Sequence, residues 1–270
     1  MRCSRKAIGV VAAVSAALAT ATTPAFGTAP SSGTGGANYV ALGDSYSSGT
    51  GTGDYFDDSG DCLRGPKAYP QLWADAHHVA DFAFDACSGA TTEDLEAEQL
   101  DSLNRNTTLV TVSIGGNDVG FAGAIRSCLL GGHDRCDEAV GEGESEARGQ
   151  LPAKLDAAYA AIASAAPNAK VVVVGYPRIS EPGDCGIPGF DEQKRRRINH
   201  GSDVLAGVLS ERAAAAGFTF ADARGAFDGH GVCADDEWIN GPSNPLRESF
   251  HPNADGHANG YLPAINAATG

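Results

Sequence analysis

The chain has 270 residues, with 19 Lys and Arg against 34 Asp and Glu, which gives a formal net charge of −15 at neutral pH. Hydrophobic residues make up 42% of the chain and charged residues 20%, a composition typical of a globular protein and not of a disordered one. The excess of acidic residues argues against a nucleic-acid partner, because phosphate binding needs a basic face. It also argues against docking on anionic membranes by charge alone.

The N-terminus has the pattern of a secretory signal peptide. Three basic residues within the first six precede an Ala- and Val-rich run over 7–21, and two small residues, Ala25 and Gly27, follow it. A buried N-terminal helix is the alternative, but the run lacks large apolar side chains for packing. We therefore expect three segments: a signal peptide over 1–27, a flexible tail over 28–37 and a single domain over 38–270. No later apolar stretch reaches about 20 residues, so we expect no integral membrane segment in the mature chain.

Five short apolar runs follow in chain order, each with the length of a buried strand. They are rich in β-branched and aromatic residues, and several stop at Gly. We predict strands over 38–43, 81–86, 109–114, 170–174 and 218–221. Apolar strands that alternate with helices are typical of a parallel sheet covered on both faces, so the predicted fold class is α/β.

Two helices are predicted between the later strands. Large apolar residues recur at spacings of four, four and three along one face of the first helix: Leu151, Leu155, Tyr159 and Ile162. The second helix is predicted over 193–216, because Asp191 can cap its start and Gly217 can end it.

The stretch Gly131–Gly149 is the one compositionally biased segment of the domain. It is rich in Gly and acidic residues around Cys136. We expect a solvated surface loop here, and a loop at the rim of a functional site is the alternative. We find no internal repeat and no linker over 38–270.

Six of the seven cysteines remain after the signal segment, and an even count in an exported protein indicates disulfides. Six cysteines allow fifteen pairings, which sequence alone does not resolve. Short loops close most readily, so we expect nearest-neighbour pairing: Cys62–Cys87, Cys128–Cys136 and Cys185–Cys233. Zinc binding is the alternative, but the chain has no CxxC pair to hold the metal.

Residues that can take part in catalysis follow three of the predicted strands. Ser45 lies in Gly-Asp-Ser after the first strand, Gly89 in Ser-Gly after the second, and Asn117 in Gly-Gly-Asn-Asp after the third. The carboxyl ends of parallel strands meet at one edge of a sheet, so these residues should converge there. Serine can act as a nucleophile, and glycine and asparagine N–H groups can donate to a developing oxyanion. The base that serine needs could be His251, in His-Pro-Asn near the C-terminus.

In this order and placement, the four motifs resemble those of the SGNH/GDSL hydrolase superfamily. With the six cysteines, they are similar to its secreted streptomycete lipases and esterases. The resemblance implies a three-layer, flavodoxin-like α/β sandwich with a five-stranded parallel sheet. It implies Ser45 as nucleophile and His251 as general base and acid. It also implies an oxyanion hole formed by the Ser45 and Gly89 backbone amides and the Asn117 side chain.

The expected function is that of a secreted, extracellular serine ester hydrolase that cleaves carboxylic esters through an acyl-enzyme on Ser45. The resemblance favours an ester or acyl-lipid substrate. It also implies that the protein is a monomer and needs no cofactor or metal. A carbohydrate deacetylase on the same fold is the alternative, because this fold also serves acetyl-sugar esters. Acyl-chain length and head-group preference depend on pocket depth and stay open at this stage.

One position departs from the superfamily pattern. An Asp usually lies three residues before the histidine, whereas here Glu248 occupies that position. Glu is one methylene longer, so its carboxylate can overshoot the imidazole. We expect His251 to be held by a main-chain carbonyl, from Glu248 or Ser249, and Glu248 as a triad acid is the alternative.

Three further functions fit the sequence less well. An α/β-hydrolase requires a GxSxG elbow, which is absent. A metal hydrolase could use His251, Asp255 and His257, but their spacing does not match HExxH. A secreted carbohydrate-binding module would show several exposed aromatics, and the chain has only two tryptophans, Trp73 and Trp238.

Overall fold

Five parallel strands form one sheet in the spatial order β2-β1-β3-β4-β5. The computed structural model describes residues 36–183 and 185–270. The predicted signal segment over 1–27 lies outside these residues, as do positions 28–35 of the predicted tail. The strands are β1 (Asn38–Gly43), β2 (Asp81–Phe84), β3 (Leu109–Ser113), β4 (Lys170–Val174) and β5 (Thr219–Ala221).

The central strands are apolar on both faces because both faces of the sheet are covered. Leu42 in β1 pairs with Val112 in β3, which pairs with Val173 in β4, and all three side chains are fully buried. The edge strand β2 is only partly buried and ends two residues earlier than predicted. The N–H groups of its next two residues both donate to the Ala41 carbonyl, at 2.8 and 3.1 Å, so the chain leaves the ladder there.

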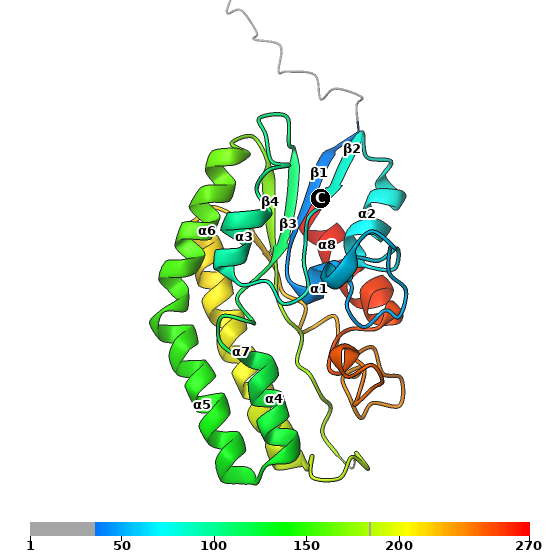
Figure 1. Ribbon diagram of the computed structural model, residues 1–270, viewed down its shortest axis with the longest axis vertical. Coiled ribbons are helices and arrows are strands. Elements are labelled where there is room, and N and C mark those ends of the chain that lie inside the picture. Colours follow the sequence, from blue (N-terminus) through cyan, green and yellow to red (C-terminus); the bar gives the residue numbers. More distant parts are fainter. Residues whose placement is uncertain (1–35, 184) are drawn as a thin grey trace, which may run out of the picture. The chain divides into compact units, whose positions relative to one another are not determined.

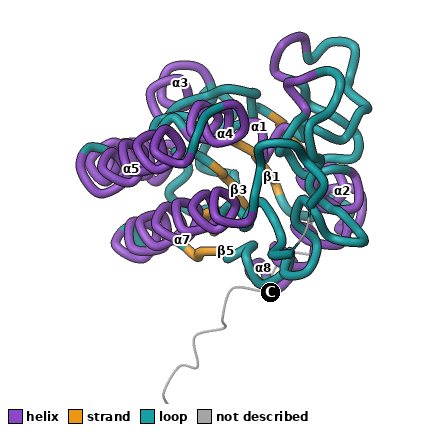
Figure 2. Tube along the Cα trace, turned by 90° about the horizontal axis from the view of Figure 1, so that it is seen from below, coloured by secondary structure: helices purple, strands orange, loops and turns teal. Residues whose placement is uncertain are grey.

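Helices cover both faces of the sheet, as Figures 1 and 2 show. One face carries α2 and α8, and the other carries α3, α6 and α7, with α4 and α5 packed beside α7. The predicted α/β three-layer fold is confirmed. The helix bounds are α1 (Ser45–Ser48), α2 (Tyr69–His77), α3 (Thr92–Glu98), α4 (Phe121–Leu130), α5 (His133–Gly149), α6 (Leu151–Ala165), α7 (Glu192–Ala215) and α8 (Leu262–Thr269).

Both predicted helices are present, and the second lies within one residue of its predicted bounds at each end. The first is α6, and its predicted apolar face is buried. In α7 the Asp191 side chain accepts a hydrogen bond from the Lys194 backbone amide, which caps the helix start. Gly217 follows the last turn with φ at 75°, the left-handed conformation in which glycine ends a helix without strain.

The prediction of a loop over Gly131–Gly149 is wrong, because most of this segment is helix α5. Its Cys136 and Val140 are buried, and α5 packs along α4 and α7. The glycine at position 143 has a role in this packing, since a Cβ there would lie 3.0 Å from the Val119 carbonyl oxygen. Ion pairs from Arg197 to Asp137 and Glu144 add to the contact with α7. Tertiary contacts therefore override the low helix propensity of Gly.

The cysteines of the described chain form three disulfides between nearest neighbours: Cys62–Cys87, Cys128–Cys136 and Cys185–Cys233. The first of them lies beside the edge of the sheet where the candidate residues lie. Cys87 follows β2, and the Cys62 carbonyl accepts the Ser88 N–H at 3.0 Å. This disulfide therefore ties the turn that contains Gly89 to the loop after α1.

Candidate active site

Ser45 occupies the first position of α1, directly beyond the carboxyl end of β1. Asp44 caps this short helix, and its Oδ1 atom accepts the Tyr46 N–H at 3.0 Å. The sharp turn requires glycine at position 43, where φ is 127° and a Cβ would lie 2.4 Å from the Ser113 carbonyl oxygen. The turn therefore holds the serine at the sheet edge in a fixed orientation.

The serine and the distant histidine meet at hydrogen-bond distance. Ser45 Oγ lies 2.9 Å from His251 Nε2, across 206 positions of sequence. On the far side of the ring, His251 Nδ1 lies 3.1 Å from the Ser249 carbonyl oxygen. A carbonyl can only accept, so Nδ1 carries the proton and Nε2 is left as the acceptor for the serine hydroxyl.

Burial sets the charge of this imidazole. Burial lowers the pKa of His251 to about 4, and the hydrogen bond to the Ser249 carbonyl opposes that shift. A lowered histidine pKa means that the ring is neutral at any pH well above 4. A neutral imidazole is the form that can take a proton from a serine hydroxyl.

The chain before His251 is fixed by backbone pairing. The His251 carbonyl accepts the Asn240 N–H at 2.9 Å, and the Phe250 N–H donates to the Asn240 carbonyl at 2.8 Å. The Tyr46 hydroxyl, one residue after Ser45, donates to the Phe250 carbonyl at 2.7 Å. This last bond connects the serine turn directly to the histidine segment.

The Glu248 carboxylate bonds to a tyrosine and not to the imidazole. Its Oε1 atom accepts a hydrogen bond from the Tyr55 hydroxyl at 2.8 Å, and the same hydroxyl accepts the Gly51 N–H at 3.0 Å. The acceptor for His251 Nδ1 is instead the carbonyl of Ser249. Glu248 therefore connects the loop after α1 to the segment that contains the histidine.

We expect Glu248→Gln to retain activity within about tenfold of the unaltered enzyme, because the carbonyl that orients His251 is untouched. The glutamine side chain keeps an oxygen that can accept from Tyr55. Measuring kcat and the melting temperature of the purified variant checks this. A drop in kcat beyond about a thousandfold, with normal melting, would instead make Glu248 a member of a triad.

The three candidate oxyanion donors lie on three adjacent strand ends, those of β1, β2 and β3. Gly89 has φ at 87°, and a Cβ there would meet open space, so the left-handed backbone and not crowding favours glycine. Within the described residues, the N–H groups of Ser45 and Gly89 have no intramolecular acceptor. Asn117 Nδ2 donates to the Ala90 carbonyl at 2.9 Å, which orients the amide and leaves its second N–H hydrogen for another acceptor.

Asp44, the residue before the serine, carries a buried carboxyl group and was not among the predicted site residues. Asp44 accepts hydrogen bonds from the Tyr46 N–H, the Ser113 hydroxyl at 2.8 Å and the Tyr176 hydroxyl. Burial raises the pKa of Asp44 to about 6, against the opposing effect of these bonds. Tyr176 carried no sequence signal, because it lies 132 residues from Asp44.

The residues considered for a metal hydrolase do not form a ligand set. His257 is fully buried, and its Nδ1 atom accepts the Tyr69 N–H at 3.1 Å. Burial lowers the pKa of His257 to about 3. Over 36–183 and 185–270, no group of three or more His, Cys, Asp or Glu side chains is arranged to hold a metal ion.

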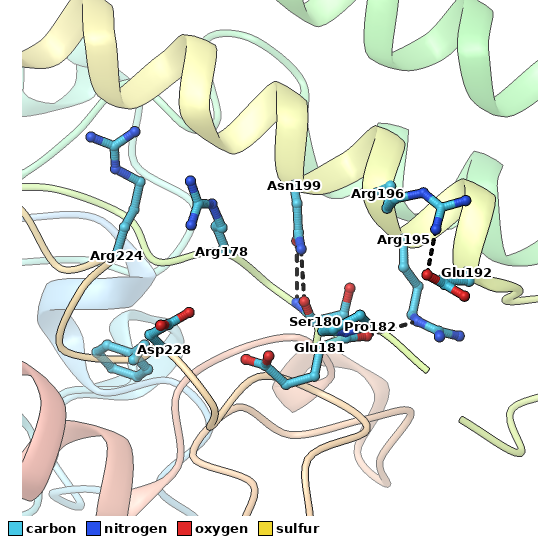
Figure 3. A pocket seen from close by; sticks show the side chains of 11 residues that line it. Arg178, Ser180, Glu181, Pro182, Glu192, Arg195, Arg196, Asn199, Arg224 and Asp228 are labelled. Atoms are coloured by element: carbon cyan, nitrogen blue, oxygen red, sulfur yellow. Dashed lines mark hydrogen bonds and ion pairs between the residues drawn. The ribbon is translucent and has the colours of Figure 1, made fainter. Parts of the chain in front are cut away.

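A separate cavity of about 210 Å³ lies beyond the carboxyl end of β4. Figure 3 shows the four arginines that line it: Arg178, Arg195, Arg196 and Arg224. Each of them already has a partner. Two pair with Asp203, one pairs with Glu192, and the buried Arg195 donates to backbone carbonyls. None of the four candidate catalytic residues lines this cavity, so we assign it no part in the candidate active site.

The GDSL-like lipase/acylhydrolase family matches residues 41–258, a range that includes all four candidate residues. The chain belongs to this family. Lipase 1 of Streptomyces coelicolor is 49% identical over 231 residues, which cover 85% of this chain and 86% of that protein.

Two crystal structures are similar to most of the chain. An extracellular lipase from Streptomyces rimosus superposes with a TM-score of 0.84 at 45% identity, covering 86% of this chain and 99% of that one. A phospholipase A1 from Streptomyces albidoflavus NA297 has the same TM-score and coverage at 44% identity. The family and these relatives identify the chain as a carboxylic ester hydrolase, as the sequence motifs implied.

Proposed function

We propose that the protein is a secreted lipase or phospholipase that cleaves acyl esters of lipids through a Ser45 acyl-enzyme. The observation that carries this proposal is the 2.9 Å contact between Ser45 Oγ and His251 Nε2 at the carboxyl edge of the sheet. A serine hydroxyl is a weak nucleophile until an adjacent base accepts its proton. His251 is neutral and correctly protonated for that role.

In the proposed reaction, Ser45 Oγ attacks the ester carbonyl carbon as its proton passes to His251 Nε2. The carbonyl oxygen becomes an oxyanion that accepts from the Ser45 and Gly89 amides and from the Asn117 side chain. His251 then gives the proton to the leaving alcohol, and the acyl group stays on Ser45. Water, deprotonated by the same imidazole, releases the fatty acid and restores the serine.

Three observations support export. The sequence pattern over 1–27 is that of a signal peptide. Disulfides are typical of proteins that fold in an oxidising compartment, and the described part of the chain contains three. The relative from Streptomyces rimosus is described as extracellular.

In the part of the chain that the structure describes, we find no helix whose length and apolarity suit a bilayer crossing.

Exposed apolar side chains on two segments that a hydrogen bond joins near His251 in the chain favour a lipid substrate. Within the described residues, three large hydrophobic side chains are exposed: Phe56, Leu130 and Leu246. Leu246 is 81% exposed and lies five residues before His251. Phe56 follows Tyr55, whose hydroxyl bonds to Glu248 at 2.8 Å, two residues after Leu246. Two of the three therefore lie on segments joined beside the histidine.

A series of p-nitrophenyl esters from acetate to palmitate, together with phosphatidylcholine vesicles, tests the proposed substrate class. We expect kcat/KM to rise with chain length and fatty acid to be released from the vesicles. A fluorophosphonate should label Ser45 and abolish both activities. Activity confined to acetate and acetylated xylan would instead favour the carbohydrate deacetylase, and absence of labelling would contradict the acyl-enzyme.

We expect Leu246→Ser to lower the rate on vesicles about tenfold, because transfer of a leucine side chain into lipid contributes about 1.5–3 kcal/mol. Activity on soluble p-nitrophenyl acetate should stay unchanged. Leu130→Ser is the matched control, since Leu130 is 73% exposed at the end of α4. An equal effect of both substitutions on vesicle hydrolysis would contradict a lipid-facing role for Leu246.

A further inference from the structure

The Tyr176 hydroxyl lies between the two turns that contain the proposed nucleophile and the proposed oxyanion donor. Tyr176 comes two residues after β4 and is 2% exposed. Its hydroxyl donates to Asp44 Oδ2 and accepts the Gly116 N–H at 3.0 Å. Asp44 precedes Ser45, and Gly116 precedes Asn117. One hydroxyl therefore connects the side chain of the residue before Ser45 to the backbone of the residue before Asn117.

The other bonds of Asp44 make this connection specific. Its Oδ1 atom accepts from the Tyr46 N–H and from the Ser113 hydroxyl, so Oδ2 is the oxygen that Tyr176 occupies. Asp44 is 1% exposed, and water cannot readily replace a lost donor there. A buried acceptor that loses its partner is costly, so the surrounding turn is expected to shift.

Packing holds the phenol ring in place. A Cβ at Gly116 would lie 3.1 Å from both the Cζ and hydroxyl atoms of Tyr176, so only glycine admits the ring at its present position. On another side, the rings of Tyr46 and Tyr176 meet edge to face with centroids 5.0 Å apart. The hydroxyl position is therefore fixed by contacts to both turns as well as by its own hydrogen bonds.

We infer that Tyr176 is a positioning residue, whose hydroxyl holds the Ser45 turn and the Asn117 turn at the separation that the reaction requires. It contacts neither the substrate nor the reacting atoms, and it acts through Asp44 and Gly116. The inference rests on the proposed roles of Ser45 and Asn117. Catalytic geometry is sensitive to such spacing, because a misplacement of about 1 Å can cost about a hundredfold in rate.

The test compares Tyr176→Phe with Tyr159→Phe. Both tyrosines are buried, but within the described residues the Tyr159 hydroxyl has no hydrogen-bond partner. We expect Tyr176→Phe to lower kcat on a soluble ester about tenfold to a hundredfold, with KM within about twofold. The affinity for a trifluoromethyl ketone, which forms a tetrahedral adduct on serine, should fall in parallel with kcat. Tyr159→Phe should change neither value.

A second pair of variants tests the contact between Gly116 and Tyr176 without removing the tyrosine hydroxyl. Gly116→Ala should displace the Tyr176 ring by a few tenths of an ångström and lower kcat with KM preserved. Gly123→Ala in α4 is the matched control, since a Cβ there meets open space. This pair also serves as the test if Tyr176→Phe does not fold.

The outcomes separate the inference from the proposed function. Unchanged kcat and ketone affinity in Tyr176→Phe or, if that variant does not fold, in Gly116→Ala would overturn the positioning role. A rise in KM with unchanged kcat would do the same, because it indicates a substrate-binding effect. Full activity in Ser45→Ala would instead overturn the proposed function itself. Parallel losses in kcat and ketone affinity, in a variant folded at the assay temperature, support the positioning role.

Discussion

Ser45→Ala and His251→Ala are each expected to lower kcat by about 10⁵–10⁶-fold, and the double variant is expected to be little worse than either one. The two side chains share one proton across a 2.9 Å contact, so removal of either disables the same step. Residual activity comes from the oxyanion donors and from substrate binding, which both substitutions leave in place.

The measurement is kcat on a soluble p-nitrophenyl ester, with active-site titration to exclude traces of unaltered enzyme. His133→Ala is the control, because this histidine is exposed at the start of α5 and pairs with Asp191 at the surface. Losses that multiply in the double variant would show that the two residues act in separate steps. That result would contradict the Ser–His pair.

Asn117→Ala is expected to lower kcat by about 10²–10³-fold with little change in KM, because the bond to the oxyanion strengthens only in the transition state. The substitution also removes the 2.9 Å bond to the Ala90 carbonyl. The melting temperature of the variant therefore has to be measured together with its kinetics.

Asn168→Ala provides the control for loss of an asparagine bond to a backbone carbonyl. The Asn168 side chain donates to the Arg105 carbonyl at 2.9 Å at an exposed position. The Asn168→Ala substitution should leave both kcat and KM unchanged. A pure rise in KM for Asn117→Ala would assign that side chain to substrate binding.

The sheet was predictable from sequence because its strands are buried on both faces. Val171–Val174 in β4 forms a continuous apolar run that no other local structure explains as well. Segment 131–149 was not predictable in the same way. Its glycines and acidic residues favour a loop locally, and part of the packing that stabilises the helix comes from α7, about 50 residues later.

In the candidate site, too, residues in local motifs could be predicted from sequence, and residues that act through distant contacts could not. Ser45, Gly89 and Asn117 could be found from sequence because each follows a strand, and parallel strands end at one edge. Tyr55 and Tyr176 could not be found, because their partners lie 193 and 132 residues away and neither belongs to a local motif. Contacts of this kind depend on the packed fold and leave no pattern in a short window of sequence.

The acceptor that orients His251 is a backbone carbonyl, a group that every amino acid carries. Alanine scanning of the segment before the histidine would leave the Ser249 acceptor in place, so that experiment would miss its role. The side chains at positions 248 and 249 bond to other partners, Tyr55 and Ser243, and neither of them accepts from the imidazole. In the proposed site, the orientation of the imidazole therefore depends on the path of the backbone before His251, and not on the chemistry of the side chain at position 249.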